Sequence, residues 1–281
     1  MILSPTDEIK KRLNNKIALN LIEEIPVKWE KIGDVLVVVL PSSLNKYKEV
    51  IGRAYADSLK CKTVLNDIGG ITGELREPNV EIIYGDRDSE TIHRENGVKF
   101  KLDPQKVMFS SGNMDERIRM ATVLNQDEIV VDLFAGIGYF TLPIAVHNKP
   151  RKIYAVEKNP IAFKYLEENI VLNNVTSIVE PVFGDNEHIA PKNVANRVIM
   201  GYIGDTYRFL NIGFSCLKNN SGIIHFHDKY PVDIVPDKPF ESFQNLARKL
   251  DLNINLLSFR KVKSFAPGIN HYVFDLEIDE R

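Results

Sequence analysis

The sequence has few cysteines and no excess of charge of either sign. Its two cysteines, Cys61 and Cys216, are far apart and lack the spacing of metal ligands. This excludes a disulfide-rich secreted scaffold and a cysteine-based metal centre, and it indicates buried thiols in a reducing compartment. Lys and Arg number 36 against 38 Asp and Glu, so the formal net charge is −2. The overall charge therefore gives no indication of nucleic-acid binding, and an RNA partner would need a local basic patch.

Long apolar runs, signal-peptide features, internal repeats and low-complexity segments are also missing. We therefore expect a cytoplasmic enzyme without membrane association. Hydrophobic residues make up 44% and charged residues 26% of the 281 positions. This composition is ordinary for a globular protein, and the length is sufficient for two domains.

Residues 1–102 are predicted to form a small α+β domain. Asn96-Gly97 separates two alternating segments and is a strong hairpin signal. Three glycines between residues 67 and 78 indicate a loop. The expected elements are helices over 5–22 and 45–59 and strands over 34–40, 63–66, 80–84, 91–95 and 98–102.

Residues 103–281 are predicted to form an α/β domain with a mostly parallel sheet, because strands and helices alternate from residue 129 onward. The last connection, 263–270, is too short for a crossover, so the final two strands must pair antiparallel. A seven-stranded, mostly parallel sheet with one reversed strand is the class I methyltransferase (Rossmann-like) architecture. The expected strands are 129–132, 152–157, 178–183, 197–200, 222–227, 255–262 and 271–278, and the expected helices are 115–124, 139–147, 160–173, 205–217 and 239–250.

The loop after the first strand of this sheet is the most informative motif. An apolar run ends in Asp132, and Phe134-Ala135-Gly136-Ile137-Gly138 follows. The Gly-x-Gly spacing lets the backbone approach a nucleotide-type ligand. The third glycine of the dehydrogenase fingerprint is missing, however, and an acid at the strand end would repel a pyrophosphate. Both features favour a ligand without phosphates, of which S-adenosylmethionine is the common one.

Acidic residues end three successive strands of this region. They are Asp132, Glu157, which lies 25 residues later, and Asp185. A carboxylate at the end of the second strand can accept hydrogen bonds from both ribose hydroxyls, and Asp185 with Asn186 can hydrogen-bond the adenine edge. The alternative is that each acid caps the following helix, with Asp132 a structural acid rather than a ligand.

Four segments resemble the tRNA guanosine N1-methyltransferase family, which modifies the purine at position 37 beside the anticodon. They are residues 106–110 (KVMFS), 116–119 (ERIR), 132–138 (DLFAGIG) and 261–268 (KVKSFAPG), the last together with His271. The resemblance covers roughly residues 30–281 and is specific in its combination of motifs.

The end of the fourth strand departs from that family's pattern. The methyltransferases carry Asn-Pro-Pro there to orient the target, whereas this chain has Met200-Gly201-Tyr202 and contains no Asn-Pro-Pro. Here the chain resembles the sister family, the wybutosine-synthesising tRNA(Phe) 7-aminocarboxypropyl transferases. That resemblance implies transfer of the 3-amino-3-carboxypropyl group of S-adenosylmethionine to C7 of the tricyclic guanosine derivative at position 37, with release of methylthioadenosine.

The resemblance also implies partners. The anticodon region of tRNA(Phe) is the expected macromolecular partner, the small first domain is expected to contact it, and we expect a monomer without a metal. Two alternatives stay open. One is a tRNA guanosine-37 N1-methyltransferase with an unusual fourth-strand motif, and the other is a non-catalytic RNA module that binds S-adenosylmethionine.

The resemblance further extends the cofactor-binding set. It places Ser110 and Arg117 at the methionine carboxylate, which an arginine can hold in a bidentate grip. Arg119 lies on another helix face and cannot share this role; the alternative for Arg117 is a surface position on a charged helix. Tyr202 is either a stacking platform or a core aromatic. The predicted cofactor-binding residues are Ser110, Arg117, Asp132, Phe134, Ala135, Gly136, Gly138, Glu157, Lys158, Asp185, Asn186, Met200 and Tyr202.

His225 and His227 share one face of a predicted strand, next to Asp228. No third ligand stands at a characteristic spacing, so we expect a core pair or a polar lining rather than a metal site. The sequence identifies no general base.

Two basic clusters are candidates for phosphate contact. One is Lys46, Lys48 and Arg53 in the first domain, and the other is Arg260, Lys261 and Lys263 near the end of the chain. A solvated surface is the alternative for each.

Overall fold

The computed structural model describes residues 3–280, which form two compact units. The first unit comprises residues up to 95 together with Lys99–Ser111, and the second comprises Asn96–Val98 and the residues from 112 onward. Residues 103–111 therefore belong with the first unit, whereas the sequence placed the boundary at 102. Among the described residues, no helix is long and apolar enough to cross a membrane.

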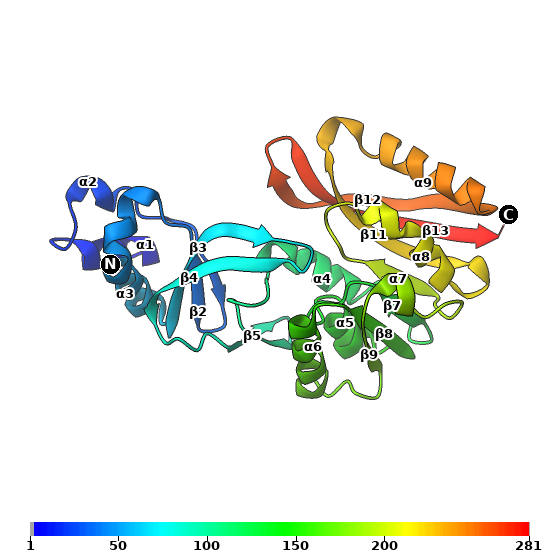
Figure 1. Cartoon of the computed structure of the whole chain (residues 1–281), viewed down its shortest axis with the longest axis horizontal. Coiled ribbons are helices and arrows are strands. Elements are labelled where there is room, and N and C mark those ends of the chain that lie inside the picture. Colours follow the sequence, from blue (N-terminus) through cyan, green and yellow to red (C-terminus); the bar gives the residue numbers. More distant parts are fainter. Residues whose placement is uncertain (1–2, 281) are drawn as a thin grey trace. The chain divides into compact units, whose positions relative to one another are not determined.

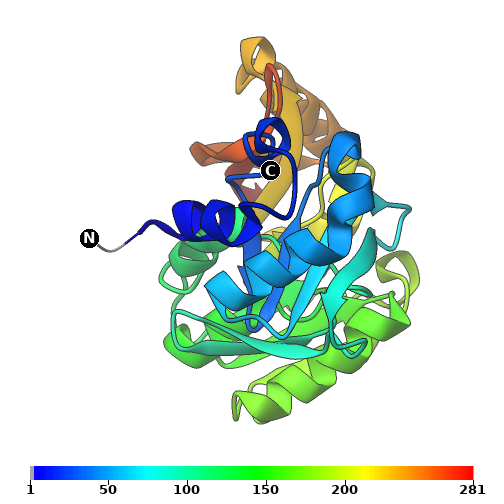
Figure 2. The same ribbon diagram turned by 90° about the vertical axis from the view of Figure 1, so that its left-hand side faces the viewer.

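Three α-helices, a four-stranded sheet and a two-stranded hairpin build the described part of the first unit. Its elements are α1 (Pro5–Leu13), α2 (Leu19–Ile22), β1 (Glu30–Ile32), β2 (Val35–Val38), α3 (Lys48–Leu59), β3 (Thr63–Thr72), β4 (Glu77–Gly85), β5 (Thr91–Glu95) and β6 (Val98–Leu102). Four strands pair in the order β1-β2-β3-β4, and β5 pairs with β6. Helix α3 packs on β3 and β4, and α1 packs on α3 (Figures 1 and 2). Ile9, Leu13, Ile51 and Tyr55 are fully buried between these layers.

Two expectations for this unit are wrong. The helix expected over 5–22 is broken, because Asn15 adopts a φ of 64° and separates α1 from α2. Residues 67–78 are not a loop, because β3 and β4 continue through most of the segment as an antiparallel pair. Asp67 accepts hydrogen bonds from the N–H groups of Gly69 and Gly70 within a bulge of this pair. The glycines therefore mark a bulge and a tight turn.

A seven-stranded sheet forms the centre of the second unit (Figure 1). Its elements are α4 (Met114–Met120), β7 (Ile129–Asp132), α5 (Thr141–Pro143), β8 (Lys152–Glu157), α6 (Pro160–Leu172), β9 (Val179–Phe183), α7 (Asn186–Ile189), β10 (Arg197–Met200), α8 (Leu210–Cys216), β11 (Gly222–Pro231), α9 (Asp237–Lys249), β12 (Leu252–Ala266) and β13 (Ile269–Glu280). The strand order is β12-β13-β11-β10-β7-β8-β9. Strands β7 to β11 pair in parallel, and β13 runs antiparallel to both of its neighbours. This confirms the predicted class I methyltransferase fold.

Strands β12 and β13 are longer than expected. The sequence predicted 255–262 and 271–278, but the pair continues until a tight turn in which Gly268 has a φ of 72°. Strand β11 extends equally far, because its pairing with β13 continues to Pro231 opposite Ile269. These three strands therefore run past the end of β10, whose last pair joins Met200 to Phe226.

A buried ion pair fastens α4 to the sheet. Arg119 of α4 donates to both carboxylate oxygens of Asp275 on β13, at 2.8 and 3.1 Å, and it pairs with Glu116 of its own helix at 2.5 Å. Asp275 also accepts from Ser258 of β12 at 2.6 Å. Burial favours the neutral carboxyl, but hydrogen bonds from His225 and Ser258 and the charge of Arg119 hold the pKa of Asp275 well below its usual range. Asp275 is therefore the anionic centre of this cluster.

His225 extends the cluster across the sheet, and its two hydrogen bonds allow only one tautomer of its ring. Arg197 of β10 donates to its Nε2 at 2.7 Å, and Nδ1 lies 2.5 Å from Asp275. Because a guanidinium only donates, Nε2 must accept and Nδ1 must carry the proton. Burial lowers the pKa of His225, which agrees with this neutral tautomer. Arg197 in turn donates from Nε to the carboxylate of Glu128 at 2.6 Å, and this bond is the last of the series.

Two further histidines, His227 and His271, pair with each other on the same face. Nδ1 of His227 and Nε2 of His271 are 3.0 Å apart, and both side chains are buried. Burial and the charge of Lys263 lower the pKa of His271 to about 3, and burial with its neighbouring histidines lowers that of His227 well below its usual value. Both rings are therefore neutral near neutral pH.

We predict that acid destabilises the second unit through these three histidines. Their folded-state pKa values lie below the unfolded value of about 6.5, so their contribution is complete above that pH and is lost as the pH falls toward the folded-state pKa. Each should lower the free energy of unfolding by up to about 1.4 kcal/mol per pH unit in this range. Urea unfolding from about pH 7 to 4 measures the slope, which should be shallower in His271→Gln but unchanged in His188→Gln, at an exposed position. Equal slopes in wild type and His271→Gln would contradict the assignment.

Candidate cofactor and acceptor site

Asp132 supports the loop after β7 from the inside. Its side chain is fully buried, and its two oxygens accept from the N–H of Phe134 at 3.3 Å and the hydroxyl of Thr141 at 2.8 Å. Burial raises the pKa of Asp132 to about 6, and the nearby charge of Glu157 adds to the increase. Of the two alternatives left by the sequence, the geometry supports the structural acid.

The loop itself requires glycine at two positions. Gly136 has a φ of 57° and Gly138 a φ of 100°, both in the left-handed region. A Cβ on Gly138 would lie 2.6 Å from Cγ of Leu142, and one on Gly136 would lie 2.4 Å from the ring of Tyr139. Ala135 is fully buried and presents no surface to a ligand, which does not support its predicted contact with the cofactor. The motif therefore shapes a backbone turn at the carboxyl end of the sheet.

Glu157 joins the ends of β7 and β8. Its half-buried carboxylate accepts from the N–H groups of Gly136 and Asn159, each at 2.7 Å, and a third bond comes from the backbone of Lys158. Burial raises the pKa of Glu157 although these N–H bonds oppose the increase. A carboxylate offers about four acceptor positions, so this one keeps capacity for a ligand hydroxyl.

Asp185 and Asn186 follow β9 as predicted. Asp185 caps α7 through the N–H of Glu187 at 3.0 Å and lies 3.5 Å from Nζ of Lys158. The bond from Glu187 and the charge of Lys158 lower the pKa of Asp185. Asn186 is buried and donates to the carbonyl of Leu133 at 3.0 Å, which ties this strand end to the loop after β7. The ends of β7, β8 and β9 thus form one connected edge.

The end of β10 contributes an aromatic side chain. Tyr202 stacks on Phe134 with ring centroids 5.1 Å apart and an angle of 23° between the planes, and Phe209 packs edge-on against both rings. Met200, by contrast, is fully buried in the core beneath α8. Our assignment of the Met200 side chain to the cofactor is therefore corrected, because it presents no surface to a ligand.

Asp228 has a role that the sequence did not reveal. Its carboxylate accepts from the N–H groups of Gly204 and Thr206, both at 2.9 Å, and so holds the loop after β10 from strand β11. The signal was present, since Asp228 is a fourth acid near the end of a parallel strand. In the sequence, Asp228 stands out only as a neighbour of His225 and His227. Within residues 3–280, no group of three His, Cys, Asp or Glu side chains is arranged to hold a metal.

Arg117 lies inside the protein. Its side chain is 2% exposed, which excludes the surface position that the sequence left open. Arg119 is engaged by Glu116 and Asp275, so it is committed to holding α4. Ser110 is half-buried and belongs to the first unit.

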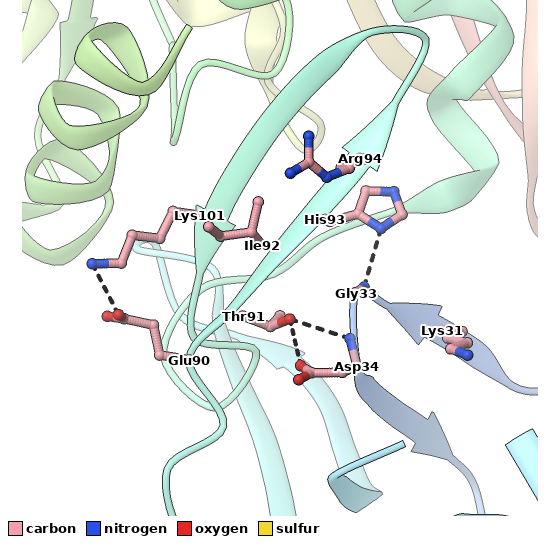
Figure 3. A pocket seen from close by; sticks show the side chains of 9 residues that line it. All are labelled: Lys31, Gly33, Asp34, Glu90, Thr91, Ile92, His93, Arg94 and Lys101. Carbon is pink, nitrogen blue, oxygen red and sulfur yellow. Dashed lines mark hydrogen bonds and ion pairs between the residues drawn. The ribbon is translucent and has the colours of Figure 1, made fainter. Parts of the chain in front are cut away.

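A pocket of about 820 Å³ opens in the first unit between the β1–β2 turn and the β5–β6 hairpin (Figure 3). Two of its charged groups pair with each other, Lys101 with Glu90 at 2.9 Å, and the hydroxyl of Thr91 donates to Asp34 at 2.6 Å. None of the predicted cofactor-binding residues lines this pocket.

The sheet order, the glycine loop and the acids at three strand ends define a transferase of the class I methyltransferase fold that uses S-adenosylmethionine. Residues 91–255 match the model of the TRM5/TYW2 methyltransferase domain, and residues 9–89 match that of the TYW2 N-terminal domain. The chain belongs to the TRM5/TYW2 family.

Individual relatives agree with this assignment. The chain is 44% identical to a tRNA(Phe) (4-demethylwyosine(37)-C(7)) aminocarboxypropyltransferase of Methanocaldococcus jannaschii, over 90% of this chain and 98% of the relative. It is 35% identical to the tRNA (guanine(37)-N(1))-methyltransferase Trm5b of Pyrococcus abyssi, over 90% of this chain and 76% of that protein. The crystal structure of P. horikoshii TYW2 in complex with MeSAdo superposes with a TM-score of 0.88 at 39% identity, over 98% of this chain and 100% of the other.

We predict that Glu157→Ala weakens binding of S-adenosylmethionine much more than binding of tRNA. Loss of hydrogen bonds to a charged acceptor should cost about 1.5–3 kcal/mol. Calorimetry with each ligand measures the effect, and circular dichroism checks that the variant is folded. Glu180→Ala is the matched control, because Glu180 is an exposed acid on the neighbouring strand β9 that pairs with Lys152. Unchanged affinity for S-adenosylmethionine in Glu157→Ala would remove Glu157 from the ribose site.

Proposed function

We propose that this protein transfers the 3-amino-3-carboxypropyl group of S-adenosylmethionine to C7 of 4-demethylwyosine at position 37 of tRNA(Phe). The observation that carries the proposal is the 44% identity to an aminocarboxypropyltransferase across 98% of that relative, against 35% to the Trm5b methyltransferase. The end of β10 supports it, because Met200-Gly201-Tyr202 stands where the methyltransferases carry Asn-Pro-Pro.

The reaction forms one carbon–carbon bond and breaks one carbon–sulfur bond. C7 of the base attacks the γ-carbon of the methionine arm, and the electron pair of the broken bond stays on sulfur. The sulfonium thereby becomes the neutral thioether of methylthioadenosine, and the proton on C7 leaves to water to restore the aromatic ring. The methyl carbon is less hindered than the γ-carbon, so the protein must select by alignment, which can contribute several kcal/mol.

The adenosine half of the cofactor binds at the edge formed by β7, β8 and β9. Glu157 accepts from the ribose hydroxyls with the part of its carboxylate that the N–H group of Gly136 does not occupy. Asp185, which is half-exposed, accepts from the adenine amino group, while Lys158 flanks it. Buried Asn186 acts through the loop that it fixes. This arrangement holds adenosine as in other enzymes of the fold.

The methionine half then turns toward Arg117 of the second unit. A guanidinium with low exposure is only weakly screened, so it is suited to a bidentate bond with the methionine carboxylate. Fixing the carboxylate at that end draws the γ-carbon, rather than the methyl group, into line with the acceptor. Tyr202 and Phe134 present a stacked aromatic surface for the tricyclic base.

The anticodon region of tRNA(Phe) supplies the acceptor, and the first domain, residues 1–102, contributes to holding it. Lys46, Lys48 and Arg53 provide cations for this contact on and next to α3. Lys48 already pairs with Glu81 at 2.5 Å, so Lys46 and Arg53 are the stronger candidates. The enzyme acts as a monomer in the cytoplasm, without a metal.

We predict that Arg117→Ala reduces the affinity for S-adenosylmethionine at least about tenfold more than the affinity for methylthioadenosine. Only the former ligand carries the carboxylate. Because Arg117 is buried, the substitution also affects stability, but comparing two ligands on the same variant cancels that effect. Isothermal titration with both compounds measures the ratio, and equal losses would assign Arg117 a structural role.

The function itself is tested by mass spectrometry of tRNA(Phe) that carries 4-demethylwyosine, after incubation with the protein and S-adenosylmethionine. We expect a mass gain of one aminocarboxypropyl group and the release of methylthioadenosine. The control is tRNA(Phe) with unmodified guanosine at position 37, which should not react. Methylation of that control with release of S-adenosylhomocysteine would instead show a guanosine-37 methyltransferase, and binding without turnover would show a non-catalytic module.

A further inference from the structure

Three strands of the second unit extend past the carboxyl edge of the sheet. Strand β10 ends opposite Phe226, but β11, β13 and β12 continue together to the turn at Pro267-Gly268. We call this extension the arm and define it as residues 227–231, 260–266 and 269–273. Figure 1 shows its hairpin, orange to red, running beyond the end of the neighbouring strands. Because parallel α/β sheets bind ligands at their carboxyl edge, the arm stands beside the acceptor site.

One face of the arm is cationic. Lys229, His271 and Lys263 lie in one cross-strand row, and Arg260 lies on the same face two pairs further along, opposite Val273. Arg260 is half-exposed and lies 3.9 Å from Glu116. Segment 260–271 contains no carboxylate. This is a local positive patch on a chain whose formal net charge is −2.

An exposed aromatic ring lies beside these cations. Phe265 is 47% exposed at the tip of the arm, and Nζ of Lys229 lies 4.6 Å from the centre of its ring. The tip is held to the segment that follows β11, because the N–H of Val232 donates to the carbonyl of Gly268 at 3.0 Å. Asp233 is the exposed acid of this following segment. A ring next to lysines matches the way proteins hold unpaired nucleotides, by stacking on a base and pairing with phosphates.

We propose that this face of the arm binds the tRNA loop next to the target nucleotide, with Lys229, Lys263 and Arg260 at phosphates and Phe265 stacked on an unpaired base. The assignment rests on the proposed function, since the acceptor base lies in an anticodon loop. Two observations favour RNA as the occupant. The cations of the arm complement the negative phosphates of RNA, and the arm is continuous with the carboxyl edge of the sheet, where the acceptor base is proposed to bind.

The proposed phosphate contacts are tested with a double variant that combines Lys229→Gln and Lys263→Gln. The matched control combines Lys218→Gln with Lys249→Gln, which removes the same charge from exposed positions at the opposite edge of the sheet. The affinity for tRNA(Phe) is measured over a range of salt concentrations. Loss of two phosphate contacts to a single strand should make the slope of log K against log salt shallower by about 1.4. The affinity for S-adenosylmethionine should stay unchanged in both variants.

The aromatic part is tested with Phe265→Leu and Phe265→Tyr. Loss of one stacked base should raise the KM for tRNA about tenfold in the leucine variant and leave kcat at saturating tRNA close to wild type. The tyrosine variant keeps a ring and should behave like wild type.

Two outcomes would overturn the proposal. The first is a lysine variant whose tRNA affinity and salt slope equal those of the control, as expected if the arm contacts a protein. The second is a leucine variant with an unchanged KM. Failure of the proposed function is recognised separately, because wild-type protein would then transfer no aminocarboxypropyl group, whatever the arm variants bind.

Discussion

The ion pair between Arg119 and Asp275 is the constraint on which the rest of the second unit depends. It joins α4 to the reversed strand β13, and through His225 and Arg197 it reaches the centre of the sheet. Arg119 is largely withdrawn from water and also pairs with Glu116, so removing Arg119 would leave the carboxylates of Asp275 and Glu116 without their cation, at a cost of about 3–5 kcal/mol. Since α4 also carries Arg117, the same pair that anchors the helix sets the position of the group proposed for the methionine carboxylate.

The strand-end acids show how burial assigns different roles to similar residues. Asp132 is fully buried and holds the glycine loop, while Glu157 is half-buried and divides its oxygens between backbone N–H groups and open acceptor positions. Asp185 is the most exposed of the three, caps a helix and faces Lys158. Burial raises the pKa of the first two, whereas hydrogen bonds lower that of the third. Exposure therefore increases from Asp132, which supports the loop, to Glu157 and Asp185, which are proposed to contact the ligand.

Selection of the transferred group is a problem of geometry rather than of reactivity. All three carbons on the sulfonium are activated by the same charge, so the outcome depends on which carbon the protein aligns with the acceptor. Two anchors are proposed to act together here, a carboxylate edge that fixes adenosine and a buried guanidinium that fixes the other end of the cofactor. The stacked pair of Tyr202 and Phe134 is proposed to decide which base can approach.

The sequence alone determined the sheet, its reversed strand and the residues at the strand ends, because apolar periodicity, glycine spacing and short connections act over a few residues. It could not determine which side chains meet across long separations. The pairing of His225 with Asp275, the burial of Arg117 and Met200 and the support of the β10 loop by Asp228 were decided only by packing. The β3–β4 hairpin is a further case, since its glycines form a bulge only because a partner strand lies alongside. Such contacts depend on partners that are distant in the chain, and folding alone brings them together.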